Sequence, residues 1–90
     1  MPKPVVSSAN TTWTGDLFSG SGTTSVASGA IDTFDVSWKT RAGEAGGQTT
    51  PEELIAAAHA SCYSMALSNE LASAGTPPTR VETAAAVTFV

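Results

Sequence analysis

The sequence predicts a small domain of mixed α and β structure, in which short strands precede one long helix and a last strand follows it. Three observations predict this order. Turn residues separate short runs of β-branched and aromatic residues before position 40, a strong helix start lies at Thr50 and Pro51, and the last ten residues, VETAAAVTFV, have the composition of a strand. A chain of 90 residues forms at most one small domain.

The first part of the chain is rich in Gly, Ser and Thr, with dispersed aromatic and β-branched residues. Residues 1–10 are expected to form a loose arm, and alternation places Phe34, Val36 and Trp38 on one face of a strand. Trp13, Trp38 and Phe34 are expected in the core rather than stacked on a ligand. A disordered linker is the alternative for such a composition. Three short strands are expected, near residues 10–14, 22–28 and 33–40.

A long helix is expected from Pro51 to about Ser73, after a glycine-rich loop. Thr50 can act as N-cap, proline suits the first helical position, and Glu53 completes a capping box with Thr50. Gly75 provides the stop signal, and two prolines follow it.

This helix carries no Asp, Glu, Lys or Arg between Leu54 and Asn69. It is therefore expected to be buried around most of its circumference, and its many small residues permit close approach of another helix or a sheet. A chain of this length has little material to cover it, so a second copy of the chain or further sequence is expected to do so. A strand is expected over 81–90, and an ending within a strand suggests the N-terminal portion of a larger domain.

The composition argues against several classes of protein. Four basic and eight acidic residues give a net charge of −4, and the basic residues are scattered, which disfavours nucleic-acid binding. A single cysteine rules out an intrachain disulfide and fits a reducing compartment. The N-terminus lacks the apolar core of a signal peptide, and no apolar run is long enough for a membrane span. A cytoplasmic protein is the simplest expectation.

Cys62 lies in the uncharged part of the predicted helix, and the residues alone allow two interpretations. Helical spacing places it on a face with Ile55, Ala58 and Met65, which favours a small apolar residue in a packed core. A reactive thiolate needs a nearby cation or a helix N-terminus. Because Cys62 lies 11 residues after Pro51, it is beyond the reach of the helix dipole. A reactive Cys62 therefore requires a cation from elsewhere.

Arg41 is the leading candidate for that cation, ahead of Lys39 and Arg80, because it follows a predicted strand and opens the glycine loop. A solvated loop arginine is the alternative. The carboxylate of Glu52 could hold an arginine in a bidentate pair or simply favour the helix N-terminus. Ten residues separate Glu52 from Cys62, which is about 15 Å along a straight helix. The two side chains can therefore meet only if the helix breaks or another chain provides one of them.

His59 and Cys62 are neighbours at i and i+3 on the helix surface. A Cys-His catalytic pair or half of a metal site is conceivable. A structural zinc needs four ligands, however, and the chain has no further Cys or His. Neither a metal nor a cofactor is expected.

The segment TTPEELIAAAHASCYSMALS, residues 49–68, closely resembles the signature helix of the OsmC/Ohr family of thiol-dependent peroxidases. The likeness continues in WTGDL at 13–17, KTR at 39–41 and AGTPPTRVETAAAVTF at 74–89. The helix motif is more similar to the OsmC branch than to the organic hydroperoxide resistance branch. Residues 11–90 thus resemble the N-terminal portion of an OsmC-like domain.

The resemblance implies an α+β fold built as an intertwined homodimer, with active sites at the dimer interface. Cys62 matches the peroxidatic cysteine, Glu52 the glutamate of the PEEL motif, and Arg41 the arginine of the OsmC branch. In the family, the arginine and glutamate meet the cysteine across the dimer. The implied function is reduction of organic hydroperoxides and hydrogen peroxide with a dithiol reductant, in defence against oxidative and osmotic stress.

The sequence departs from the family pattern in one respect. Family members carry a second, resolving cysteine in their C-terminal half, whereas this chain contains only Cys62. The half cycle up to a cysteine sulfenic acid could be encoded here, but an intramolecular disulfide could not. Two alternatives follow: a non-catalytic OsmC-like domain that serves as a dimeric scaffold or binds small molecules, and a helix-plus-hairpin fragment without an independent fold.

Overall fold

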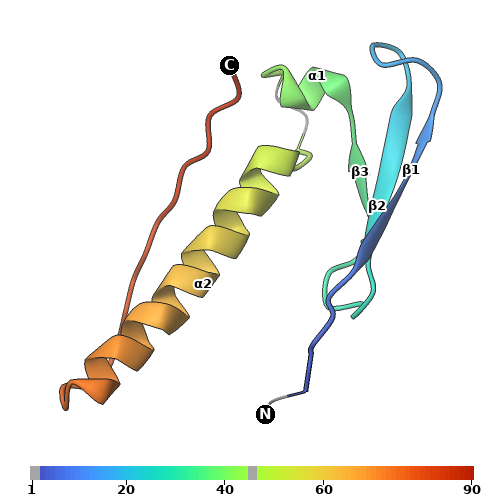
Figure 1. The fold of residues 1–90 in the computed structure, drawn as a ribbon. Helices are drawn as coiled ribbons and strands as arrows, with labels where there is room; N and C mark the ends of the chain where they lie inside the picture. Colours follow the sequence, from blue (N-terminus) through green and yellow to red (C-terminus); the bar gives the residue numbers. More distant parts are fainter. Residues whose placement is uncertain (1–2, 45–46) are drawn as a thin grey trace. The chain divides into compact units, whose positions relative to one another are not determined.

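The computed structural model describes residues 3–44 and 47–90 of the chain. The chain divides into two compact units, residues 1–50 and residues 51–90, and each unit is described by itself. The first unit contains three strands and a single helical turn, and the second contains one long helix and the segment that follows it (Figure 1). The combination is an α+β chain, as the sequence predicts.

The three strands form one antiparallel sheet with the order β1-β2-β3. All three predicted strands are present, and the first two lie within two residues of their expected bounds. The register pairs Thr12 with Thr23 and Gly22 with Val36. The bounds are β1 (Ala9–Thr14), β2 (Ser21–Val26) and β3 (Phe34–Val36).

The turn between β1 and β2 is held by Asp16. Its carboxylate oxygen Oδ1 accepts hydrogen bonds from the backbone N–H of Ser19 at 2.7 Å and from the Ser19 hydroxyl at 2.6 Å. The side-chain bond to Ser19, followed by the backbone bond, holds the pKa of the Asp16 carboxyl below its ordinary value of 3.8. The indole Nε1 of Trp13 donates to the Asp16 carbonyl at 3.1 Å. Local polar contacts therefore fix this turn.

The sheet has one apolar face, as the predicted alternation requires. Phe34 and Val36 are half-buried, whereas Asp35 between them is exposed. Gly22 is buried beneath this face, where a Cβ atom would lie 2.7 Å from the Trp13 ring and 3.0 Å from Cγ2 of Val36. The close approach of these side chains to the strand explains why glycine is needed there.

The predicted continuation of the third strand to residue 40 is wrong. The strand β3 ends at Val36, and the helical turn α1 (Trp38–Arg41) begins directly after Ser37. The Ser37 hydroxyl accepts a hydrogen bond from the backbone N–H of Thr40 at 3.3 Å and so acts as an N-cap. Trp38 therefore leaves the row of Phe34 and Val36, and its ring packs edge-on against Phe18 with centroids 5.9 Å apart.

The helix α2 (Pro51–Ser73) begins and ends where the sequence predicts. At its C-terminus, Gly75 has a φ of +87°, and its N–H donates to the Ala72 carbonyl at 3.0 Å. The N–H of Thr76 donates to the Leu71 carbonyl at 2.9 Å. These two bonds form a Schellman motif, which satisfies carbonyls at the helix end and requires a left-handed residue.

The predicted final strand over 81–90 is not present as a strand. The segment runs extended along α2 (Figure 1), without a paired strand in the described part of the chain. Strand pairing needs a backbone partner, whereas this segment is held through side chains on α2. Its residues alternate in burial: Val81, Thr83 and Ala85 are half-buried, and Glu82 and Ala84 are exposed.

Within one chain, α2 and the aromatic residues are only partly covered. Within residues 3–44 and 47–90 no hydrophobic side chain is buried, and Trp13 is 38% exposed. Most of the half-buried residues of α2 form one stripe, whereas Ile55 and Met65 outside it are 56% and 73% exposed. The stripe is covered by the segment after the helix, and burial of the rest requires a further layer. The stripe includes Ala56, Ala60, Ser64, Leu67 and Leu71.

Candidate functional site

Cys62 lies in the middle of α2, and its thiol is exposed. It is two residues from both Ala60 and Ser64, which belong to the half-buried stripe. Two residues correspond to a rotation of about 200° around a helix. Cys62 therefore faces away from the segment that covers the stripe, and the packed interpretation of Cys62 does not hold within this unit.

The surroundings of Cys62 on α2 are apolar or neutral. Ile55 and Met65, about two turns and one turn from it along the helix, are both largely exposed, and so is Tyr63 at 54%. The ring of His59 lies 6.2 Å from the ring of Tyr63, with a tilt of 43° between them. An exposed thiol at the centre of an apolar helix face is thus available to a partner or substrate of apolar character.

Glu52 and Glu53 occupy the first turn of α2, where carboxylates interact favourably with the helix N-terminus. Glu52 is half-buried and Glu53 is exposed. Because α2 is one continuous helix, the ten residues between Glu52 and Cys62 correspond to a rise of about 15 Å. The structure therefore does not bring Glu52 to Cys62 within one helix.

Arg41 is the last residue of α1, and it is exposed. It belongs to the first unit, whereas Glu52 and Cys62 belong to the second. No single unit therefore contains all three predicted site residues. Of the other cations considered for this role, Lys39 also lies in α1, and Arg80 pairs with Glu82.

The described residues contain no group of three or more His, Cys, Asp or Glu side chains that could hold a metal ion. His59 and Cys62 thus have no third ligand of these types nearby in residues 3–44 and 47–90. None of the helices there combines the length and the hydrophobicity that crossing a membrane requires.

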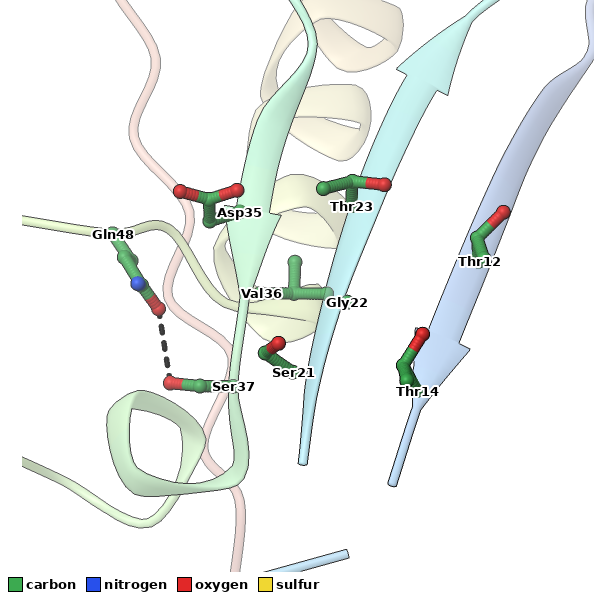
Figure 2. Close-up of a pocket in the computed structure, with 9 residues that line it drawn as sticks. All are labelled: Thr12, Thr14, Ser21, Gly22, Thr23, Asp35, Val36, Ser37 and Gln48. Carbon is green, nitrogen blue, oxygen red and sulfur yellow. Dashed lines mark hydrogen bonds between the residues drawn. The ribbon is translucent and has the colours of Figure 1, made fainter. Parts of the chain in front are cut away.

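A concavity of about 280 Å³ lies on the polar face of the sheet (Figure 2). It is lined by hydroxyl groups from β1 and β2, by Asp35 and by Gln48, whose Oε1 accepts a hydrogen bond from Ser37 at 2.9 Å. The sequence interpretation missed this feature. Its signal is the spacing of Thr12 and Thr14 on one face of β1, opposite Thr23 in the register. None of the three predicted site residues lines it.

A second polar feature that the sequence interpretation missed joins α2 to the following segment. The hydroxyls of Ser64 and Thr83 contact each other and the Ala60 carbonyl. No pattern in the sequence VETAA at 81–85 identifies the partner of Thr83.

The fold and the site together define a class of protein: an α+β chain with a small antiparallel sheet in one unit and, in the other, a long helix that carries an exposed cysteine in its uncharged middle part. This is the class that the family resemblance implies.

Comparison with known proteins identifies the relatives of this chain. A scan against models of protein families finds no match. Peroxiredoxin OsmC of Escherichia coli K12 and Peroxiredoxin OsmC of Shigella flexneri are each 49% identical to the chain over 78 residues. The match covers 86% of this chain and 53% of each relative, so the chain spans about half the length of the curated relatives it matches. The predicted resemblance to OsmC peroxiredoxins is confirmed.

Proposed function

We propose that this chain carries the peroxide-reacting cysteine of an OsmC-type peroxidase, with Cys62 as the nucleophile. The 49% identity to Peroxiredoxin OsmC is the observation that carries this proposal. Only about a dozen of the 90 residues lie outside the matched stretch of 78, so Arg41, Glu52 and Cys62 all lie inside it. The exposure of Cys62 supports the proposal, because a nucleophile must be reached by its substrate.

The proposed reaction is a two-electron reduction of a hydroperoxide. The Cys62 thiolate attacks the terminal oxygen of ROOH, a sulfur–oxygen bond forms, and the O–O bond breaks. The products are a cysteine sulfenic acid and an alkoxide, which takes up a proton and leaves as the alcohol. Sulfur is oxidised and the peroxide is reduced, with no other electron donor in this half cycle.

Arg41 and Glu52 have complementary roles in this proposal. The guanidinium of Arg41 favours the thiolate and stabilises the negative charge on the departing alkoxide. The Glu52 carboxylate holds the guanidinium in a bidentate pair, which fixes its orientation. The roughly 15 Å rise between Glu52 and Cys62 supports assembly of the site from two copies of the chain at a homodimer interface.

The apolar helix face around Cys62 supports organic hydroperoxides as the preferred substrates, with hydrogen peroxide as a poorer one. Ile55 and Met65 offer apolar contact area beside the thiol. The chain has no second cysteine, so an external dithiol is proposed to reduce the sulfenic acid. The proposed role is defence against oxidative and osmotic stress.

A non-catalytic, small-molecule-binding OsmC-like domain is the second candidate function. The observation that favours it is the polar concavity on the sheet, which lies apart from the sequence positions of the peroxidase site. In this alternative, Cys62 contributes to association with a partner and performs no chemistry.

Trapping the sulfenic acid distinguishes the two functions. The protein is treated with one equivalent of cumene hydroperoxide in the presence of dimedone, and intact and peptide masses are measured. One dimedone adduct on Cys62 is expected, and none on the Cys62→Ser variant. Absence of an adduct in the wild-type protein would exclude the peroxidase and leave the non-catalytic domain.

A further inference from the structure

A cluster of two hydroxyls and one carbonyl joins α2 to the extended segment after it. The Ser64 hydroxyl lies 2.9 Å from the Ala60 carbonyl oxygen, and the Thr83 hydroxyl lies 3.0 Å from the same oxygen. The two hydroxyl oxygens are 2.6 Å apart. We call this cluster of Ser64, Thr83 and the Ala60 carbonyl the hydroxyl clamp.

The number of protons determines how the hydroxyl clamp works. Each hydroxyl has one proton to donate and two lone pairs, so two protons serve three short contacts. One hydroxyl donates to the carbonyl and the other donates to the first hydroxyl, because two facing lone pairs at 2.6 Å would repel. The bonds form a chain in which each polarises the next. Loss of either hydroxyl therefore breaks more than one contact.

The hydroxyl clamp closes the helical turn that carries Cys62. Ala60 and Ser64 are the two ends of this turn, and Cys62 lies at its middle, on the opposite side of the helix. A serine bond to the carbonyl four residues earlier tends to bend a helix at that turn. Thr83 contacts the Ser64 hydroxyl and so links this bond to the segment 81–85. The bend of the helix at this turn is therefore influenced by a residue outside the helix.

Ser61, three residues before Ser64, offers a natural comparison. Its hydroxyl donates to the Ala57 carbonyl at 2.8 Å, which is the same bond that Ser64 makes. Ser61 is exposed, and no hydroxyl of the following segment contacts it in the described structure. The difference between Ser61 and Ser64 is therefore the contact with Thr83.

We propose that Ser64 and Thr83 are positioning residues for Cys62, which act from the back of α2 by fixing the turn from Ala60 to Ser64. The inference rests on the proposed function for its catalytic consequence, since the thiolate must align with the guanidinium and the peroxide. The hydroxyl clamp itself is a physical feature of the second unit and is tested separately.

Amide hydrogen exchange of the full chain tests the hydroxyl clamp without reference to activity. Thr83→Val is expected to speed exchange over 60–66 and 81–85 by about two- to tenfold, the range of one intramolecular hydrogen bond. Ser64→Ala should have a smaller effect on 81–85, because Thr83 can still donate to the Ala60 carbonyl, and it should add little once Thr83 is Val. Equal effects of Ser64→Ala and the control Ser61→Ala on 81–85, or additivity with Thr83→Val, would overturn the clamp.

The rate of sulfenic acid formation tests the positioning role. Thr83→Val is expected to slow the reaction of Cys62 with cumene hydroperoxide several-fold, while alkylation by iodoacetamide changes less than about twofold. Thr83→Ser keeps the hydroxyl and should restore the rate, and Thr88→Val, at an exposed position five residues further along the chain, should leave it unchanged. A wild-type rate in Thr83→Val, or no rescue by Thr83→Ser, would overturn the proposal. If wild-type Cys62 forms no sulfenic acid, the proposed function fails and the positioning role with it, whereas the exchange result still decides the clamp.

Discussion

The two units of the chain differ in how side chains shape them. In the sheet unit, side-chain hydrogen bonds close short turns, for example between Asp16 and Ser19 and between Ser37 and Thr40. In the helix unit, the Thr83 hydroxyl reaches the Ala60 carbonyl across 23 residues. Short side-chain motifs therefore fix turns of the sheet unit, whose strands pair through the backbone, whereas in the helix unit a side-chain contact joins two distant segments.

The units also differ in how far their residues are exposed to solvent. The sheet unit contains a buried glycine under an aromatic side chain, whereas no residue of α2 is buried. The helix face with Cys62 is the more open of the two faces of α2, since the segment after the helix covers the other one. The proposed chemistry thus lies on the face of α2 that the helix unit itself leaves open.

Substitution of Arg41 is expected to have the largest effect. It tests whether a cation from the sheet unit stabilises the thiolate of Cys62 in the helix unit. Arg41→Ala is expected to slow sulfenic acid formation about 10- to 100-fold, the range for loss of a charged hydrogen-bond donor. Stopped-flow mixing with cumene hydroperoxide measures the rate. Lys39→Ala, in the same helical turn, is the matched control and should react at the wild-type rate. A normal rate for Arg41→Ala would remove Arg41 from the site.

Gly22 tests how tightly the sheet unit is packed. Gly22→Ala places a methyl group 2.7 Å from the Trp13 ring and 3.0 Å from Val36 Cγ2, so unfolding free energy should fall by about 1–3 kcal/mol. Urea unfolding followed by tryptophan fluorescence measures the change. Thr23→Ala, at an exposed position of the same strand, should cost less. An equal loss in both variants would show that the close contact at Gly22 does not matter.

Features that depend on local interactions could be predicted from the sequence, whereas features that depend on competing or distant interactions could not. Both ends of α2 were predictable because Pro51 and Gly75 act locally, and the alternation of Phe34 and Val36 is local as well. The extent of β3 was not, because the capping bond of Ser37 competes with strand pairing. The final strand was mispredicted because extended residues become a strand only when a distant partner pairs with them.

The candidate site divides in a similar way. The residues alone offered Cys62, Arg41 and Glu52 as candidates, but spacing favoured a packed Cys62, and only the family resemblance assigned the three residues to one site. Exposure of Cys62 comes only from the structure. The hydroxyl clamp could not be predicted, because nothing near Thr83 in the sequence identifies Ser64 as its partner.

Asp16 tests the local character of the sheet unit through pH. The hydrogen bonds from Ser19 hold the pKa of Asp16 below its ordinary value, so the carboxylate stabilises the fold above about pH 4. This contribution should disappear as the pH falls below that value and the carboxyl takes up a proton. Unfolding of the wild-type protein and of Asp16→Asn is compared between pH 3 and pH 6. A stability difference between them that does not shrink at the acidic end would contradict the assignment.

Arg80 and Glu82 give the smallest expected effect. Their ion pair is exposed, with 79% and 74% of the two side chains accessible, and exposed pairs contribute about 0–1 kcal/mol. Arg80→Ala should therefore change the midpoint of thermal unfolding little, and added salt should reduce the difference further. A large loss would show that the segment after α2 is held by this ion pair rather than by the hydroxyl clamp.

The reactivity of Cys62 is the central claim, and the stoichiometry of hydroperoxide consumption tests it most directly. Reduced protein is mixed with a slight excess of cumene hydroperoxide and no thiol reductant, in the presence of dimedone, which traps the sulfenic acid before it is oxidised further, and the remaining peroxide is titrated. One equivalent of peroxide consumed for each wild-type chain, and none for Cys62→Ser, is the predicted result. Equal consumption by the two proteins, or no consumption by either, would contradict the assignment of Cys62 as a peroxide-reducing thiol.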